Sequence, residues 1–253
     1  MKMKQFVLTP AMGKRLIGKG VARHPVLARA LKEATVVIIA GTTNGYVAEE
    51  VLAATGQAEG FSRVAFRRGI VTPPDFDPAT AVKGDFTGDV VLIKGNWRRG
   101  KTIFDVAETL GPGDVVLKGA NAVNLRERQA AVLIGHPQAG TAGPAVAAAV
   151  GRRVKLIVPV GVEKRVTEPI ADLARRINDP ETEGPGMLPL PGEVFTELDA
   201  ISLLTGAEVT LLAGGGIYGA EGAAWVGVAG EPEQLDAASE LIASVADEPP
   251  CRV

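Results

Sequence analysis

A short run of glycine, threonine and asparagine, Gly41-Thr42-Thr43-Asn44-Gly45, is where the sequence most directly indicates chemistry. It follows an apolar, β-branched run at 35–40 and precedes a helix that we expect at 46–55. The free N–H groups of a helix N-terminus attract anions, glycines let the backbone approach, and threonine hydroxyls donate hydrogen bonds. The segment therefore predicts a phosphate or carboxylate site. A glycine-rich turn with a threonine N-cap is the alternative, and the sequence is neither a Walker A loop nor a dinucleotide fingerprint.

A lysine and two asparagines follow the apolar run 115–117. At the end of a strand, Lys118, Gly119, Asn121 and Asn124 would bring a cation and two amides to one ligand. The alternative is a polar turn in which asparagine adopts a left-handed conformation.

Two further segments supply candidates at the ends of expected elements. Lys94 and Asn96 follow the run 90–93 in the same manner, so we expect them at the same ligand. Gly140 and Thr141 precede an alanine-rich helix expected at 144–150, where the threonine hydroxyl can donate to a ligand. Close packing of small residues against the sheet is an equal alternative for this segment.

His136, between the run 131–134 and Pro137, is the histidine placed for proton transfer, with a structural role as the alternative. His24 lies in a basic helical stretch and is expected to face solvent. Two histidines and one cysteine, Cys251, are too few for a metal cluster or an internal disulfide. The sequence therefore predicts no metal site and no cofactor.

The elements that must position these residues alternate between apolar runs and helical stretches. Runs at 35–40, 90–93, 115–117, 131–134 and 154–158 are apolar without alternation, as in strands covered on both faces. A long first helix is expected at 9–32, opened by Thr9 and Pro10. Residues 1–177 therefore predict an α/β domain with a Rossmann-like, mostly parallel sheet and helices on both faces. Polar residues at the strand ends would share one edge, where ligands bind in such sheets.

The rest of the chain reads as a second, smaller unit. Residues 178–192 are rich in Pro, Gly and acids and predict a linker. Residues 193–253 predict a small α+β unit, or an extension of the sheet. It would have helices at 194–204 and 232–245 and strands at 208–212 and 223–228. The glycine-rich run 214–219 between these strands would be a loop over the site or a flexible connection.

Composition and charge exclude several classes of protein. The 253 residues are 46% apolar and 22% charged, and no apolar run approaches the roughly 20 residues of a membrane span. Without a secretory signal at residues 1–7, a cytoplasmic protein is expected. Residues 1–176 carry 26 Lys and Arg against 15 Asp and Glu, whereas residues 177–253 carry Arg252 against 14 acids. The basic part would collect an anionic ligand or contact the acidic part of a neighbouring subunit. Aromatic content of 4% argues against nucleic acid.

Several of these motifs, in this order, resemble the superfamily of ribose-5-phosphate isomerase, glucosamine-6-phosphate deaminase and the CoA-transferases. Gly41-Thr42-Thr43-Asn44 is similar to the first phosphate loop of that superfamily. The segment 119–124 is similar to a Gly-Ala-Asp-Glu-Val-Asp segment of the pentose isomerases, and Gly140-Thr141 and the run 156–160 follow in order. The resemblance implies a homo-oligomer with a late ferredoxin-like unit, here at 193–246.

Departures from the superfamily pattern limit what the resemblance implies about the reaction. Asn121 and Asn124 stand where the isomerases have acids, and an amide does not relay a proton as a carboxylate does. No glutamate follows within 140–150, and Cys251 is misplaced for methylthioribose-1-phosphate isomerase chemistry. Glu221, in a glycine-rich turn, has the local look of a CoA-transferase nucleophile. The resemblance implies an anion-binding cleft rather than ribose-5-phosphate isomerase activity.

Three hypotheses follow. In the first, an enzyme catalyses isomerisation or a related proton transfer on a small phosphorylated or carboxylated metabolite that resembles a sugar phosphate. The segment 41–45 holds the anion, Lys118 stabilises negative charge, Asn121 and Asn124 orient the substrate, and His136 transfers the proton. In the second, a regulatory protein binds such a metabolite without turning it over. In the third, Glu221 carries acyl-CoA chemistry.

Overall fold

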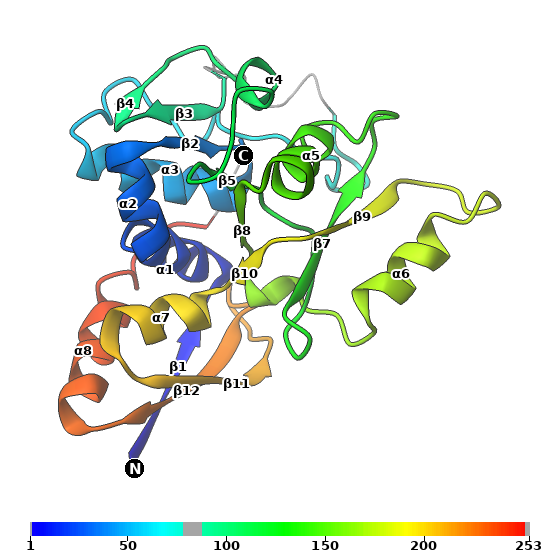
Figure 1. The fold of residues 1–253 in the computed structure, drawn as a ribbon. Helices are drawn as coiled ribbons and strands as arrows, with labels where there is room; N and C mark the ends of the chain where they lie inside the picture. The colour runs from blue at the N-terminus through cyan, green and yellow to red at the C-terminus, as the bar shows by residue number, and fades with distance from the viewer. Residues whose placement is uncertain (1, 78–87, 251–253) are drawn as a thin grey trace.

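A six-stranded mixed sheet forms the centre of the structure (Figure 1). The structure is a computed structural model that describes residues 2–77 and 88–250. Strands follow the order β10-β8-β5-β2-β3-β4 across the sheet. The parallel strands are β2 (Thr35–Ile38), β5 (Val115–Leu117), β8 (Lys155–Pro159) and β10 (Glu193–Phe195). Two antiparallel strands, β3 (Val90–Ile93) and β4 (Asn96–Trp97), complete one side. The chain is thus mixed α/β with parallel strands.

Both faces of this sheet are covered, which explains the continuous apolar runs. Val36 and Ile38 of β2 pack into one core cluster with helices α1, α2 and α3, whereas Val37 and Ile39 pack into a second cluster with α4 and α5. Burying each such side chain contributes about 1.5–3 kcal/mol. The helices are α1 (Pro10–Ala22), α2 (Pro25–Glu33), α3 (Thr42–Ala54), α4 (Ile103–Val106) and α5 (Ala142–Arg152).

The single helix predicted at 9–32 was wrong, because it is two helices. Thr9 caps α1 by accepting the N–H of Met12, as its side chain predicts. Pro25, however, lacks an N–H and would clash with a carbonyl one turn earlier, so α1 ends at Ala22 and Pro25 opens α2. Gly20 lies so close to Ala200 that a Cβ would stand 2.7 Å from the Ala200 Cβ. The glycines that weaken α1 therefore let it pack closely against its neighbours.

Two apolar runs do not take the parallel positions that we predicted for them. The run 90–93 is β3, which pairs with β2 in the antiparallel direction. The run 131–134 belongs to a separate antiparallel sheet of β6 (Ala122–Asn124), β7 (Gln129–Ile134) and β9 (Gly186–Leu190). Strand β9 lies inside the segment 178–192 that we predicted as a linker. An apolar run indicates burial but carries no signal for strand direction or for the partner strand.

The C-terminal elements form as predicted but share a sheet with the first strand of the chain. Helices α7 (Glu197–Thr205) and α8 (Pro232–Ala243) accompany β11 (Glu208–Gly214) and β12 (Ala224–Gly230). Strand β1 (Lys2–Leu8) pairs with β12, giving the order β1-β12-β11. Residues 194 and 195, predicted as the start of a helix, instead belong to β10 of the central sheet.

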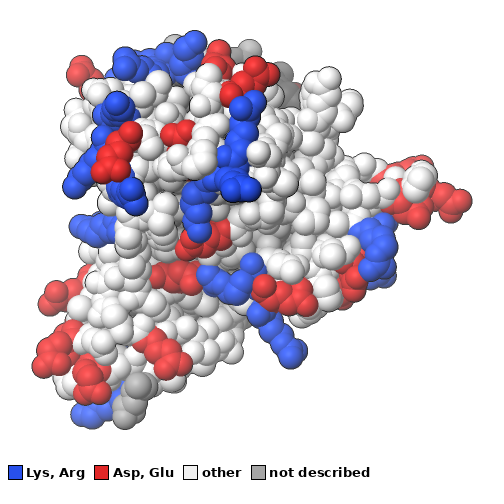
Figure 2. Space-filling view, in the orientation of Figure 1, with Lys and Arg blue, Asp and Glu red and all other residues white. Residues whose placement is uncertain are grey.

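The remaining short elements connect these layers. The 3-10 helix η1 (Val162–Lys164) follows β8, and α6 (Ile170–Ile177) packs beside β9 on the side of the molecule away from α8 (Figure 1). No helix in residues 2–77 or 88–250 has the length and apolar character of a membrane-spanning segment. In Figure 2, acidic side chains gather over the end that carries α8, while many basic side chains lie over the end with the central sheet.

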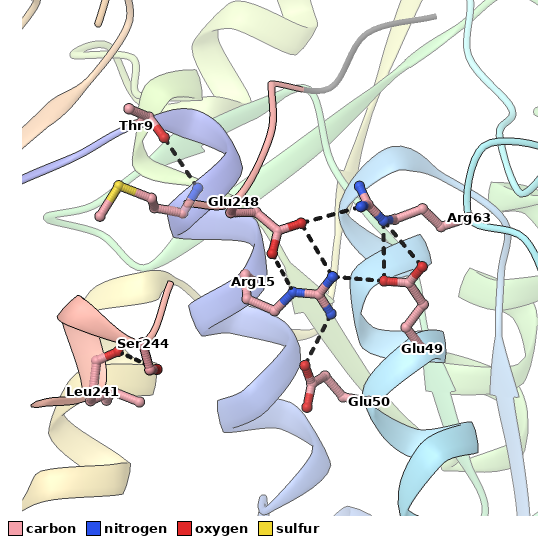
Figure 3. A network of polar contacts seen from close by, with 9 residues as sticks. Thr9, Arg15, Glu49, Glu50, Arg63, Leu241, Ser244 and Glu248 are labelled. Atoms are coloured by element: carbon pink, nitrogen blue, oxygen red, sulfur yellow. Dashed lines mark hydrogen bonds and ion pairs between the residues drawn. The ribbon is translucent and has the colours of Figure 1, made fainter. Parts of the chain in front are cut away.

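An ion-pair network attaches the C-terminal segment to the central helices (Figure 3). Arg15 of α1 donates to Glu248 at 2.8 Å, to Glu49 at 2.8 Å and to Glu50 at 3.0 Å. Arg63 donates to Glu49 and to Glu248 at 3.1 and 3.2 Å. Burial acts to lower the pKa of Arg15, but the hydrogen bonds and charges of Glu248 and Glu49 outweigh it, so the pKa is raised. One guanidinium thus joins α1, α3 and the segment after α8.

We expect Arg15→Met to destabilise the fold by about 2–4 kcal/mol, because it leaves partly buried carboxylates facing one another without their shared cation. Chemical denaturation measures this loss. Arg29→Met is the matched control, since Arg29 pairs with Glu33 in an exposed i,i+4 pair and should contribute under about 0.5 kcal/mol. Equal losses in the two variants would contradict a structural role for the network.

Candidate functional site

A cavity of about 610 Å³ lies at the carboxyl ends of β2 and β5. Its described walls come from the segment after β2, the loop 68–70, Phe104, the segment 118–121 after β5, residues 132–136 of β7 and beyond, and the start of α5. This is the sheet edge where the sequence predicted a ligand site.

The N-terminus of α3 forms one wall. The helix begins at Thr42 rather than near residue 46, so the predicted loop is mostly its first turn, with Gly41 as N-cap. Thr43 is 3% exposed, lines the cavity, and its Oγ1 has no hydrogen-bond partner among the described residues. Buried hydroxyls normally have such a partner. A free helix N-terminus and an unpaired donor therefore lie together at one cavity wall.

The rest of that segment does not line the cavity. The Asn44 amide donates to the carbonyls of Ile39 and Leu117 at 2.8 and 3.0 Å, so it holds two strand ends together. Gly45 packs against Arg63, where a Cβ would stand 3.1 Å from the Arg63 Cβ. Thr42 is exposed and lies outside the described lining. Of the five residues predicted to bind a ligand, Gly41 and Thr43 belong to the described cavity lining.

Three cationic side chains line the same cavity: Arg68, Lys118 and Lys164. Loss of hydration is the main cause that lowers the pKa of Lys118 to about 8, and the charges of Lys164 and Arg68 act in the same direction. The negative charge of Asp89 opposes them. Lys118 lies directly after β5, as predicted, whereas the sequence interpretation missed Arg68 and Lys164.

Asp89 holds the cavity edge in place from behind. Its carboxylate is fully buried and accepts the N–H groups of Ala40 and Ile103 at 2.9 and 2.8 Å. Arg68 lies 3.9 Å from it. Strand β3 runs antiparallel to β2, so its first residues lie at the same edge of the sheet as the last residues of β2. Asp89, which directly precedes β3, therefore lies at the edge where the cavity is.

Lys94 and Asn96 lie at the other edge of the sheet, for the same reason. They are exposed in the turn between β3 and β4, where the Asn96 amide donates to the Lys94 carbonyl. The prediction that they share the ligand of Lys118 depended on a parallel β3 and is corrected by its antiparallel pairing.

The other predicted residues divide between the cavity and the framework. Gly119, Asn121, Gly140 and Thr141 line the cavity. The side-chain amide oxygen (Oδ1) of Asn121 accepts the N–H of Leu133 at 3.0 Å, so this side chain also holds β7 in place.

Asn124 lies outside the described cavity lining and is not placed to orient a ligand there. It is buried at the end of β6, accepts the N–H of Glu127, and donates to the carbonyls of Thr167 and Glu168. These contacts explain the residue as a connection between β6 and the segment before α6.

His136 lines the cavity as an exposed side chain. Its Nδ1 accepts the backbone N–H of Gln138 at 3.1 Å, so a neutral ring carries its proton on Nε2. His24, expected to face solvent, is instead buried and lies 3.2 Å from Glu193.

The cavity combines positive charge with an apolar wall. No Asp or Glu belongs to its lining as far as residues 2–77 and 88–250 show, while Ile70, Phe104, Val132 and Ile134 supply apolar surface. Such a cavity suits an anionic group attached to a carbon skeleton.

Two of the missed residues had a signal in the sequence. Lys164 follows β8 within five residues, so the rule that polar residues gather after parallel strands applied to it as well. Asp89 stands immediately before an apolar run, but only an antiparallel direction makes that position part of the site. Arg68 comes from an irregular loop and had no such signal.

A second buried charged cluster lies next to Lys164. Lys14, 6% exposed, donates to Glu163 at 2.7 Å, and Glu197 accepts the N–H of Val162 at 3.0 and 3.2 Å through its two oxygens. Burial acts to raise the pKa of Glu163, but Lys14 and Lys164 hold it below the usual value. Burial and then the charge of Glu163 raise the pKa of Glu197 to about 7.

Comparisons with known proteins do not identify a family for this chain. Neither protein-family models nor curated proteins nor solved structures gave a significant match to the chain. In the described part of the chain, no group of three or more His, Cys, Asp or Glu side chains is arranged to hold a metal ion. The cavity itself is therefore the feature that indicates a function.

We expect Glu197→Gln to flatten the pH dependence of stability. The folded-state pKa of Glu197, about 7, exceeds its ordinary value of 4.5, so protonation favours the folded chain. This contribution is complete below about pH 4.5 and is lost as pH rises through about 7. It amounts to roughly 3 kcal/mol at 1.36 kcal/mol per unit.

Denaturation midpoints from pH 4.5 to 8 measure this effect. Glu233→Gln, which changes an exposed carboxyl, should keep the original pH profile. An unchanged profile in Glu197→Gln would show that another group titrates.

Proposed function

We propose that the protein binds a small phosphorylated or carboxylated metabolite in the cavity at the carboxyl ends of β2 and β5. One observation carries the proposal: the unpaired, buried hydroxyl of Thr43 lies at the N-terminus of α3, in a cavity with three cationic side chains. An anion there would accept the Thr43 hydroxyl and free N–H groups of α3, and Arg68, Lys118 and Lys164 would balance its charge.

The ligand is larger than a bare anion. A cavity of about 610 Å³ falls within the range of small-molecule sites, roughly 300–1,000 Å³. Its apolar side, which includes Phe104 and Val132, would contact the carbon skeleton. Sugar hydroxyls are usually bound by amide and carboxylate side chains. The described lining has the amides of Asn121 and Gln138 and no carboxylate.

The reaction that we propose for this cavity is isomerisation or a related proton transfer. Lys118 and His136 both line it, which supports charge stabilisation by the first and proton transfer by the second. The alternative is a regulatory protein that binds the metabolite without turnover, motivated by the amides at positions 121 and 124. Acyl-CoA chemistry has less support, because Glu221 accepts the N–H of Gly219 within its own hairpin and lies outside the described lining.

We also propose that the chain resembles the superfamily of ribose-5-phosphate isomerase and the CoA-transferases in its fold. We propose in addition that it forms a homo-oligomer. In a ferredoxin-like unit the third strand lies between the first and the second. The order β1-β12-β11, with α7 and α8 packed on one side of the sheet, has this arrangement and supports the likeness. The parallel strands β2, β5 and β8 with helices on both faces support the Rossmann-like description.

Thr43→Val tests the site with opposite expected effects on stability and binding. Without ligand, the variant should be as stable as the original or slightly more so, because an unpaired buried hydroxyl is removed. Affinity for the anion should fall about tenfold, since a hydrogen bond to a charged group contributes about 1.5 kcal/mol. Thr42→Val is the matched control and should change neither property, because Thr42 is exposed outside the lining.

Thermal unfolding against inorganic phosphate, sugar phosphates, small carboxylates, and CoA with its acyl esters supplies the measurement. A ligand at about 100 times its dissociation constant stabilises by roughly 2.7 kcal/mol, a shift of roughly 5–11 °C. No shift with any compound, or equal shifts in Thr43→Val and the original chain, would overturn the proposed site. A shift with CoA compounds alone would favour the third hypothesis.

A further inference from the structure

Lys118, which is half-buried, differs from the buried Lys14 in what surrounds its amine. Lys14 is held by Glu163 at 2.7 Å and by the Pro10 carbonyl at 3.2 Å, so it is a paired cation. The hydrogen bond from Lys118 Nζ goes to the Gly119 carbonyl at 3.4 Å, which is long. No ion pair joins Lys118 to a carboxylate within residues 2–77 and 88–250. Lys118 is instead one of the residues that line the cavity.

The groups around this amine favour its neutral form. Loss of hydration lowers the pKa of Lys118 to about 8, helped by Lys164 and Arg68 and opposed by Asp89. His136 is the remaining titratable side chain in the described lining. A neutral amine has a free electron pair and is a nucleophile toward carbonyl groups, which an ammonium is not.

We propose that Lys118 forms an imine with a carbonyl group of the ligand, which makes the ligand an aldehyde or ketone that carries a phosphate or carboxylate. The inference rests on the proposed anion site, because the anion would bring the carbonyl carbon to the amine. Nζ attacks that carbon to give a carbinolamine. The carbonyl oxygen then leaves as water, both of whose hydrogens come from the amine, and a C=N bond remains that takes up a proton from solvent. The step involves no oxidation or reduction, and water reverses it.

An imine on Lys118 would give the cavity a means of activating its ligand. A protonated C=N group withdraws electrons from the neighbouring carbon more strongly than C=O does, so a proton there is more easily removed. His136 lines the same cavity, but its neutral ring carries a proton on Nε2 and accepts the Gln138 N–H on Nδ1, so Nδ1 would have to release Gln138 before it could take that proton. This deepens the isomerisation hypothesis by naming a carbonyl substrate and a covalent intermediate.

Reductive trapping of the full-length protein tests the inference. Glycolaldehyde phosphate is added with sodium cyanoborohydride, which reduces an imine to a stable secondary amine, and peptide mass spectrometry locates the adduct. We expect most of the adduct on Lys118 and a labelling rate that rises from pH 6 to about pH 9 as its amine loses a proton. Uncharged glycolaldehyde at the same concentration should label Lys118 at least tenfold more slowly, since it lacks the anion that α3 and Thr43 would hold.

Two variants separate this inference from the anion site itself. Lys118→Arg keeps a cation in the cavity but forms no such imine, so it should retain the thermal shift with glycolaldehyde phosphate and lose the adduct. Lys32→Met, which changes an exposed lysine on α2, should leave the labelling of Lys118 unchanged. A thermal shift in the original chain without an adduct on Lys118, or labelling spread evenly over exposed lysines, overturns the imine and leaves the anion site standing. Absence of both the shift and the adduct overturns both proposals.

Discussion

The amide of Asn44 is the interaction on which the cavity depends. At the edge of the sheet, the carbonyls of Ile39 and Leu117 lie near the ends of two neighbouring parallel strands, and the Leu117 carbonyl also accepts the N–H of Ile39 at 3.0 Å. Asn44 donates to both from the first turn of α3, so the helix N-terminus is fixed against the ends of β2 and β5 together. Thr43 precedes this anchor by one residue and Lys118 follows Leu117 by one residue. Both reach a common cavity because the amide holds their backbones in register.

The parallel core was predictable because it is buried on both faces. Runs without polar residues at 36–40, 115–117 and 156–158 have few ways to avoid water other than a covered sheet. The rule that ligands bind after parallel strands then identified Gly41 and Lys118. The same rule misplaced Lys94, because β3 has the same apolar composition but runs the other way. Asp89 consequently occupies the position at the cavity edge that we had assigned to the residues after the strand.

Contacts between distant parts of the chain had no local signal. The pairing of β1 with β12 joins residues more than 200 positions apart, and neither strand alone indicates its partner. The early start of α3 is similar, because threonine, asparagine and glycine are poor helix formers. Their burial and the two hydrogen bonds of Asn44 outweigh that preference. Arg68, which the sequence interpretation missed, comes from an irregular loop, where tertiary contacts rather than local sequence decide the conformation.

The distribution of charge within the fold supports the proposal that the cavity binds an anion. Two cations outside the cavity are paired with carboxylates: Lys14 with Glu163, and Arg15 with three glutamates. Around the cavity, Asp89 lies 3.9 Å from Arg68 but stands outside the described lining, with its oxygens occupied by two backbone N–H groups. Cations gathered in a partly desolvated cavity repel one another and cost stability. Natural proteins retain such local destabilisation mainly where function needs it, and here a bound anion would relieve it.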